Sequence, residues 1–105
     1  MQQVLRTEDG RAIVRLTGRF EFSMHREFRE AVDTVLQDKD IDSVVIDLAG
    51  VDYLDSSALG MLLMLRDRAN TARKTLSLAN PRGMVKQALE IARFDGFPEL
   101  DGDRW

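Results

Sequence analysis

The chain has 105 residues, no cysteine and one histidine, and its 15 Lys and Arg against 18 Asp and Glu give a formal net charge of −3. This length is typical of one domain, so we expect residues 1–105 to form a single domain. The lack of cysteine excludes disulfides, a thiolate nucleophile and a cysteine metal site, and one histidine cannot build a histidine-rich metal site. The acidic balance argues against nucleic acid as the main partner. The composition therefore favours a binding module without cofactor or metal over an enzyme.

The first predicted elements are two strands that form a hairpin. Residues 3–7 and 11–17 read as strands, and Asp9-Gly10 between them suits the positive φ angles of a tight turn. Apolar side chains alternate along the second strand, so one of its sides is more apolar than the other. We expect Gly18 to end this strand.

The rest of the chain alternates helices and strands. In chain order, the predicted elements are a helix over 23–37 with Ser23 as its N-cap, a buried strand over 43–50, a helix over 56–72, a strand over 75–78, and a helix that begins at Pro81 and has Met84 in its apolar stripe. The turn-rich segment 94–105 could add a short final strand. This order predicts an α/β fold in which at least part of the sheet is parallel.

The predicted helix over 56–72 is the most informative segment. Asp55 occupies the N-cap position, which places Ser56 and Ser57 in the first turn. At about 100° per residue, the side that we expect to face the core carries Ala58, Leu62, Leu65 and Ala69. The opposite side carries Ser56, Gly60, Leu63, Met64 and Asp67.

This helix is more apolar than one core-facing stripe requires, since six of the seven residues from Leu59 to Leu65 are apolar. Either the helix is buried more deeply than usual, or Leu63 and Met64 stay partly exposed beside Gly60 as a docking surface for another protein. A glycine inside a helix costs about 1 kcal/mol relative to alanine, so its presence needs a reason. Close approach of a partner backbone and packing against a neighbouring strand are both open.

The start of the same helix is also a candidate modification site. Free N–H groups and the helix dipole favour an anion in the first turn, and a phosphate on Ser56 would add about −1.5 to −2 charges there at neutral pH. Such a charge beside an apolar patch would act mainly on a partner, which would have to desolvate it. On the residues alone, a capping Asp-Ser-Ser is ordinarily a helix start and no more.

The stretch VVIDLAGVDYLDSSALGMLL, residues 44–63, resembles the signature of STAS domains, specifically of bacterial anti-sigma factor antagonists. In that signature an apolar strand leads into Asp-Ser-Ser/Thr-Gly-Leu-Gly at the start of a helix. The resemblance extends to the early hairpin, the first helix, the Pro-initiated helix and a Gly-x-x-acid turn at Gly18-Arg19-Phe20-Glu21. It implies a STAS fold, with a single mixed sheet of four to five strands and helices packed mainly on one face.

The resemblance also implies a phosphorylation switch. By position in the motif, Ser56 is the phosphoacceptor, and Asp55 helps to position it and meets the partner kinase. For partner binding, the resemblance points to Asp55, Ser57, Gly18 and Glu21, and the helix pattern described above adds Gly60, Leu63 and Met64. In the family, the unphosphorylated protein binds an anti-sigma factor, commonly a serine kinase, which frees the sigma factor. Phosphorylation ends this binding, and a metal-dependent Ser/Thr protein phosphatase resets the switch.

Two departures from the family pattern bear on the partner. Ala58 stands where the motif usually has glycine, and Arg19 reverses a charge in the turn, where many members read Gly-Glu-Leu-Asp. That turn lies near the acceptor in the family. The partner could therefore be a response regulator with kinase or phosphatase output instead of a free anti-sigma kinase.

Enzymatic and metal-binding functions fit the sequence poorly. A serine hydrolase would need a base for Ser56, but His25 is the only imidazole and G-x-S-x-G is absent. The acidic segment 38–42 lacks the glycine and glutamate of a calcium loop, and there is no P-loop motif. The basic residues that we interpret as a solvated face are Arg66, Arg68, Arg73 and Lys74.

The remaining expectations concern the location of the protein in the cell and its type of function. No apolar run is long enough to span a membrane and the N-terminus does not read as a signal peptide, so we expect a cytoplasmic protein without membrane contact. The resemblance makes it a regulator of sigma-factor-dependent transcription and not an enzyme. The alternative is a constitutive STAS scaffold subunit of a stress-signalling or lipid-transport complex, in which Ser56 would be unused.

Overall fold

The computed structural model describes the backbone of residues 2–91 and the side chains of residues 7–90. In chain order, the elements are β1 (Gln2–Glu8), β2 (Arg11–Phe20), the short 3-10 helix η1 (Phe22–Met24), α1 (His25–Gln37), β3 (Ser43–Leu54), α2 (Ser56–Thr71), β4 (Thr75–Ala79) and α3 (Gly83–Ile91). None of the helices within this range has the length and apolar character needed to cross a membrane. The final strand considered for residues 94–105 lies outside the described residues.

The strands form one mixed sheet in the order β1-β2-β3-β4. β1 and β2 are an antiparallel hairpin, and its turn residues Asp9 and Gly10 have φ angles of 51° and 79°, as the Asp-Gly pair predicts. β2 pairs parallel with β3, and β3 pairs parallel with β4. Parallel neighbours require a crossover connection, which α1 and α2 provide. The predicted α/β fold with a mixed sheet is confirmed.

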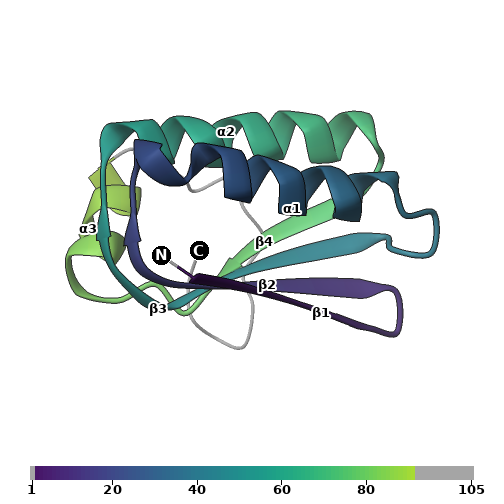
Figure 1. Ribbon diagram of the computed structural model, residues 1–105, viewed down its shortest axis with the longest axis horizontal. Coiled ribbons are helices and arrows are strands. Elements are labelled where there is room, and N and C mark those ends of the chain that lie inside the picture. Colours follow the sequence, from purple (N-terminus) through teal and green to yellow (C-terminus); the bar gives the residue numbers. More distant parts are fainter. Residues whose placement is uncertain (1, 92–105) are drawn as a thin grey trace.

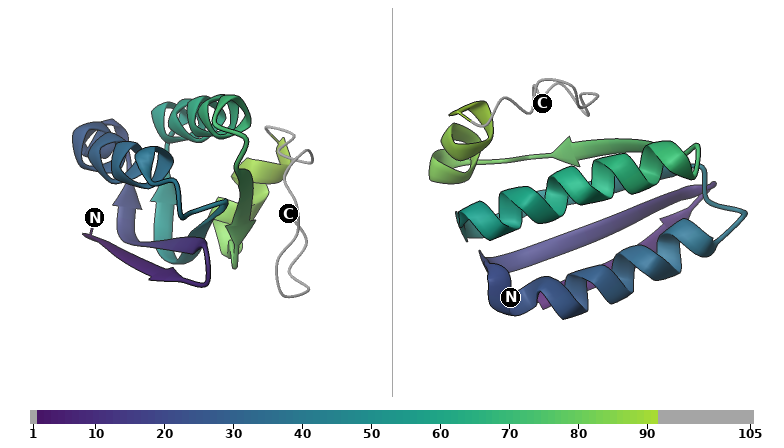
Figure 2. Two further views of the ribbon diagram at one scale, coloured as in Figure 1. Left: turned by 90° about the vertical axis from the view of Figure 1, so that its right-hand side faces the viewer. Right: turned by 90° about the horizontal axis from the view of Figure 1, so that it is seen from above.

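The helices cover mainly one face of this sheet, as predicted. α1 and α2 lie side by side on that face, and α3 lies at the end of the sheet where α2 begins (Figures 1 and 2). The core fills the space between the sheet and these two helices. The rings of Phe20 and Phe28 are 5.1 Å apart in this core and join the end of β2 to α1.

Two predicted strand ends are wrong, and they share one cause. Gly18 does not end β2, because its φ of 88° and the register shift that follows it form a bulge, through which the strand continues to Phe20. β3 runs alongside this extension and ends at Leu54 instead of near Gly50. The longer strands carry the chain to the point where α1 and α2 begin (Figure 1).

The starts of α1 and α3 also differ from the prediction. Ser23 lies inside η1, where its hydroxyl donates to the Glu21 carboxylate at 3.5 Å, so it does not cap α1. The N-cap of α1 is Met24, whose side chain makes no capping bond. α3 begins at Gly83, and Met84 in its first turn is 49% exposed, so it does not belong to the buried stripe of that helix.

Candidate functional site

Asp55 is the N-cap of α2, as predicted, and it also ties two distant segments together. Its Oδ1 accepts a hydrogen bond from the Ala58 N–H at 2.8 Å, which satisfies one free donor of the helix start. Its Oδ2 accepts from the Phe22 N–H at 3.3 Å, and its own N–H donates to the Phe20 carbonyl at 3.3 Å. One carboxylate therefore caps α2 and fixes the segment after β2 against it.

Ser56 and Ser57 are the first two residues of α2. Ser56 is exposed and Ser57 is half-buried. The N–H groups of these first-turn residues have no acceptor within the helix, and they point out of its positive end. A negative group on the Ser56 hydroxyl would thus be accessible from solvent and would lie where the helix favours an anion.

The two sides of α2 are divided as the helical spacing predicts. The side that faces the sheet carries Ala58, Leu62, Leu65 and Ala69, all at most 1% exposed. On the other side Leu63 is 39% exposed and Met64 is 44% exposed. The interpretation that the helix is buried more deeply than usual is therefore wrong. Two large apolar side chains face solvent about two turns after Ser56.

Gly60 lies on the exposed side of α2, between Ser56 and these two apolar side chains. A Cβ added at this position would meet no atom of the neighbouring structure within 4 Å. Packing against a neighbouring strand therefore does not explain this glycine, and that interpretation is wrong. Of the two reasons considered, the close approach of a partner backbone is the one that stays open.

The segment from Gly18 to Glu21 lies beside the start of α2, as the resemblance implies. The guanidinium of Arg19 sits over the Tyr53 ring, 4.0 Å from its centroid, and its Nε lies 3.4 Å from the Glu21 carboxylate. Glu21 stands between the two residues that hydrogen-bond to Asp55. Gly18 has a backbone reason of its own, its positive φ at the bulge, and its contact with a partner stays a prediction.

The structure adds one residue to this site that the sequence analysis missed. Phe22 is 61% exposed, and its ring stacks on His25 with 4.9 Å between the centroids and 12° between the planes. The hydrogen bond from its N–H to Asp55 places it next to the start of α2. The available signal was a pair of phenylalanines on either side of Glu21, because Phe20 alone fills the core there.

The comparisons with known proteins decide the family. The chain matches the family model described as "Mlab, STAS domain" over residues 4–100. It belongs to the STAS-domain family. The STAS-domain containing protein PA14_20770 of Pseudomonas aeruginosa (strain UCBPP-PA14) is 41% identical over 92 residues, which make up 87% of this chain and 89% of that protein.

Two solved anti-sigma factor antagonists share the fold of this STAS domain. The one from Mycobacterium paratuberculosis superposes with a TM-score of 0.77 at 21% identity, covering 95% of this chain and 87% of that chain. The Bacillus cell fate determinant SpoIIAA, in its phosphorylated form, superposes with a TM-score of 0.74 at 14% identity, covering 91% of this chain and 87% of that chain. At these identities the likeness concerns the fold.

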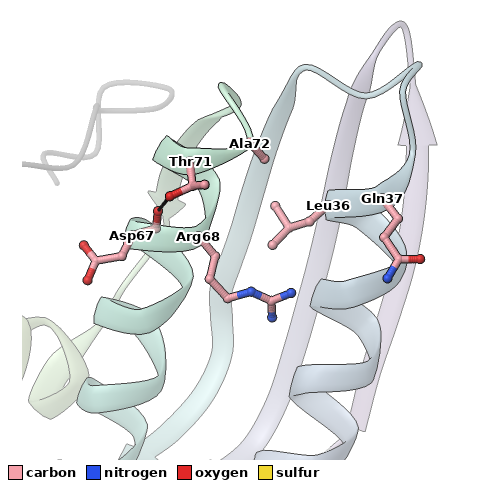
Figure 3. Close-up of a pocket in the computed structure, with 6 residues that line it drawn as sticks. All are labelled: Leu36, Gln37, Asp67, Arg68, Thr71 and Ala72. Atoms are coloured by element: carbon pink, nitrogen blue, oxygen red, sulfur yellow. Dashed lines mark hydrogen bonds between the residues drawn. The ribbon is translucent and has the colours of Figure 1, made fainter.

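The opposite end of the STAS domain carries a hollow that does not belong to this site. It has a volume of about 400 Å³ and lies between the ends of α1 and α2, lined by Leu36, Gln37, Asp67, Arg68, Thr71 and Ala72 (Figure 3). Arg68 is already paired with Asp33 at 2.6 Å, so its charge is compensated. Thr71 lies about 22 Å along α2 from Ser56. Within residues 7–90 no group of three His, Cys, Asp or Glu is arranged to hold a metal ion.

Lys74, which follows α2, corrects one further prediction. It is 9% exposed and does not belong to a solvated face. Its Nζ donates to the carbonyl of Asp38 at 2.8 Å and to the carbonyl of Ile41. This lysine therefore ties the loop after α1 to the start of β4, and its role is structural.

Proposed function

We propose that this STAS domain is a phosphorylation-controlled partner-switching regulator, with Ser56 as the acceptor. Its unphosphorylated form binds an anti-sigma factor with serine kinase activity, or a related regulator, and so controls sigma-factor-dependent transcription. The observation that carries the proposal is the exposed Ser56 at the capped start of α2, one turn before Gly60 and about two turns before two exposed apolar side chains. The shared fold with SpoIIAA, a protein solved in phosphorylated and unphosphorylated forms, supports it.

The electrostatics of the helix start support a switch that leaves the fold intact. The positive end of α2 stabilises a phosphate by about 0.3–1 kcal/mol. Repulsion from Asp55 costs about 0.8 kcal/mol per unit charge at about 5 Å in water-like dielectric. For the −1.5 to −2 charges of a phosphate this repulsion amounts to about 1.2–1.7 kcal/mol. The net cost is then at most about 1.4 kcal/mol, which is small beside the roughly 5–15 kcal/mol that stabilise a typical domain, so the domain stays folded.

The main effect of the phosphate then falls on the partner. No ionisable side chain lies between Asp55 and Arg66, so the exposed side of this stretch is uncharged before modification. Phosphorylation moves the net charge from −3 to about −5, and most of that change is at Ser56. A partner that covers this side would have to desolvate a dianion, which ends binding.

In this proposal the domain supplies no chemistry of its own. The kinase is the anti-sigma factor or a response regulator, and a metal-dependent Ser/Thr phosphatase resets the switch. The domain acts in the cytoplasm without cofactor, nucleic acid or membrane contact. Asp55, Ser57, Gly60, Leu63, Met64, Gly18 and Glu21 contact the partners.

The experiment compares variants of Ser56 in two measurements. After exposure to native lysate with ATP, intact mass should show one phosphate on the wild type and on Ser57→Ala, and none on Ser56→Ala. In a pull-down from the same lysate, Ser56→Ala should retain a partner that Ser56→Asp loses. Equal retention by both variants, or no phosphate on Ser56 under any condition, contradicts the proposal.

The alternative is a constitutive scaffold subunit of a stress-signalling or lipid-transport complex. It is favoured by the exposed apolar side of α2, which can dock a partner whether or not Ser56 is modified. The same experiment separates the two functions. A scaffold would carry no phosphate and would retain the same partner with Ser56→Ala and Ser56→Asp.

A further inference from the structure

Gly60 is unlike the other glycines of residues 2–91, because the fold gives no reason for it. Three of the others have positive φ angles, namely Gly10, Gly18 and Gly83. Gly50 is fixed by contact, since a Cβ there would lie 2.6 Å from the Thr17 Cγ2. Gly60 has helical geometry inside α2, and a Cβ there would meet no neighbouring atom within 4 Å. Alanine would fit at this position and would favour the helix.

The position of Gly60 is as informative as its open surroundings. It follows Ser56 by four residues and precedes Met64 by four, so all three lie on one side of α2. Leu63 and Met64 project beside it and are 39% and 44% exposed. The missing side chain therefore leaves the main chain of α2 uncovered between the acceptor serine and two apolar side chains.

We propose that Gly60 is the point of closest approach of the partner, where an uncharged segment of the partner lays its main chain against α2. This inference rests on the proposed function and names the partner chemistry of the same site. The domain gives up helix stability at Gly60, and the complex regains it through contacts that a Cβ would block. Gly60 is thus a residue that determines partner specificity and contributes nothing to the fold.

The charges around Gly60 define the segment that fits. Residues 56–65 carry no ionisable side chain, so a charged partner side chain buried against them would find no counter-charge within this stretch. The partner segment therefore carries a small or absent side chain over Gly60 and apolar side chains that contact Leu63 and Met64. The partner segment reaches as far as Ser56. A phosphate on Ser56 would therefore face the uncharged surface of the partner.

The test uses the protein that Ser56→Ala retains and Ser56→Asp loses, purified as a binding probe. The Cβ of Gly60→Ala meets no neighbouring atom in the free domain, and Gly60→Leu carries a larger side chain from the same exposed position. Gly60→Ala should raise the melting temperature by about 3–6 °C, because it removes the glycine penalty. It should weaken binding of the probe about tenfold, and Gly60→Leu should weaken it further, as overpacking predicts.

Asn70→Ala is the matched control, an exposed position on α2 about 15 Å further along the helix. It should raise the melting temperature slightly and leave binding unchanged. A lower melting temperature for Gly60→Ala would show that the fold needs the glycine and would overturn the inference. Unchanged binding would also overturn it, while the Ser56 dependence of the same probe would leave the proposed function standing. If no protein is retained by Ser56→Ala and lost by Ser56→Asp, both the proposed function and this inference are overturned.

Discussion

The two halves of α2 differ in where their surface side chains find partners. In the first half, residues 56–65, the outward side is uncharged and exposes Leu63 and Met64. In the second half, residues 66–71, Arg68 pairs with Asp33 of α1 at 2.6 Å, and the Thr71 hydroxyl donates to the Asp67 carbonyl. One helix thus satisfies its surface within the chain at one end and offers apolar surface to solvent at the other.

Because of this difference, the residues of α2 that affect stability and those that affect partner binding lie in different parts of the helix. Both halves bury the same kind of stripe against the sheet, with Ala58 and Leu62 in the first and Ala69 in the second. Only the outward sides diverge. We therefore expect substitutions at the second end to change the free energy of unfolding without affecting partner binding. Substitutions on the outward side of the first half should do the reverse.

The largest expected effect on stability is at Lys74, directly after the second half of α2. Lys74→Met keeps most of the apolar stem but removes the donor to the carbonyls of Asp38 and Ile41. The Asp38 carbonyl keeps the Ile41 N–H as a donor, but the buried Ile41 carbonyl loses the lysine. This loss should lower the free energy of unfolding by about 2 kcal/mol, measured by urea denaturation. Binding of the partner, measured where the variant is folded, should be unchanged.

The matched control for Lys74 is Lys39→Met, in the same loop region. Lys39 is exposed, so its loss should change the free energy of unfolding by less than about 0.5 kcal/mol. If the two variants were equally stable, the buried lysine would not hold the loop. If folded Lys74→Met bound the partner more weakly, the expectation that the second end of α2 does not affect partner binding would be wrong.

The next effect should appear in binding and not in stability. Met64→Lys places a charge in the apolar surface of the first half, which the partner would have to desolvate on binding. Binding should weaken at least tenfold, or about 1.4 kcal/mol, in a titration with the partner. Because Met64 is 44% exposed, the free energy of unfolding should change by less than about 0.5 kcal/mol.

Asn70→Lys gives the same charge to the second half of the helix and serves as the control for Met64→Lys. It should alter neither binding nor stability by a measurable amount, because Asn70 is exposed and remote from Ser56. A collapse of the melting temperature with Met64→Lys would identify Met64 as a core residue. Equal loss of binding with both variants would mean that the partner covers the whole helix.

Local pattern was sufficient to predict the parts of the site that lie on α2. Asp55 as N-cap depends on residues within one turn, and the division between buried Leu62 and exposed Leu63 depends only on helical spacing. The Asp-Gly hairpin turn is equally local. These features follow from neighbours in the sequence, which a single chain displays directly.

The features that the sequence did not predict depend on contacts between distant residues. The bond between Phe22 and Asp55 spans 33 residues, and the bond from Lys74 to Asp38 spans 36. The continuation of β2 through Gly18 depends on pairing with β3, which compensates for the break that a glycine predicts. Spacing along one element carries no information about such partners.

The smallest expected effect is the coupling between Arg68 and Asp33. The side chains are 36% and 37% exposed, so solvent screens the pair, and close geometry alone does not make it strong. A double-mutant cycle with Arg68→Ala and Asp33→Ala should give a coupling free energy of about 0.5 kcal/mol, measured by urea denaturation. The coupling should fall at high salt, because both groups are accessible to counter-ions. A coupling above about 1.5 kcal/mol that resists salt would mean that the pair holds α1 against α2. The packing of the second half of α2 against α1 would then depend more on this ion pair than on the buried apolar side chains around Ala69.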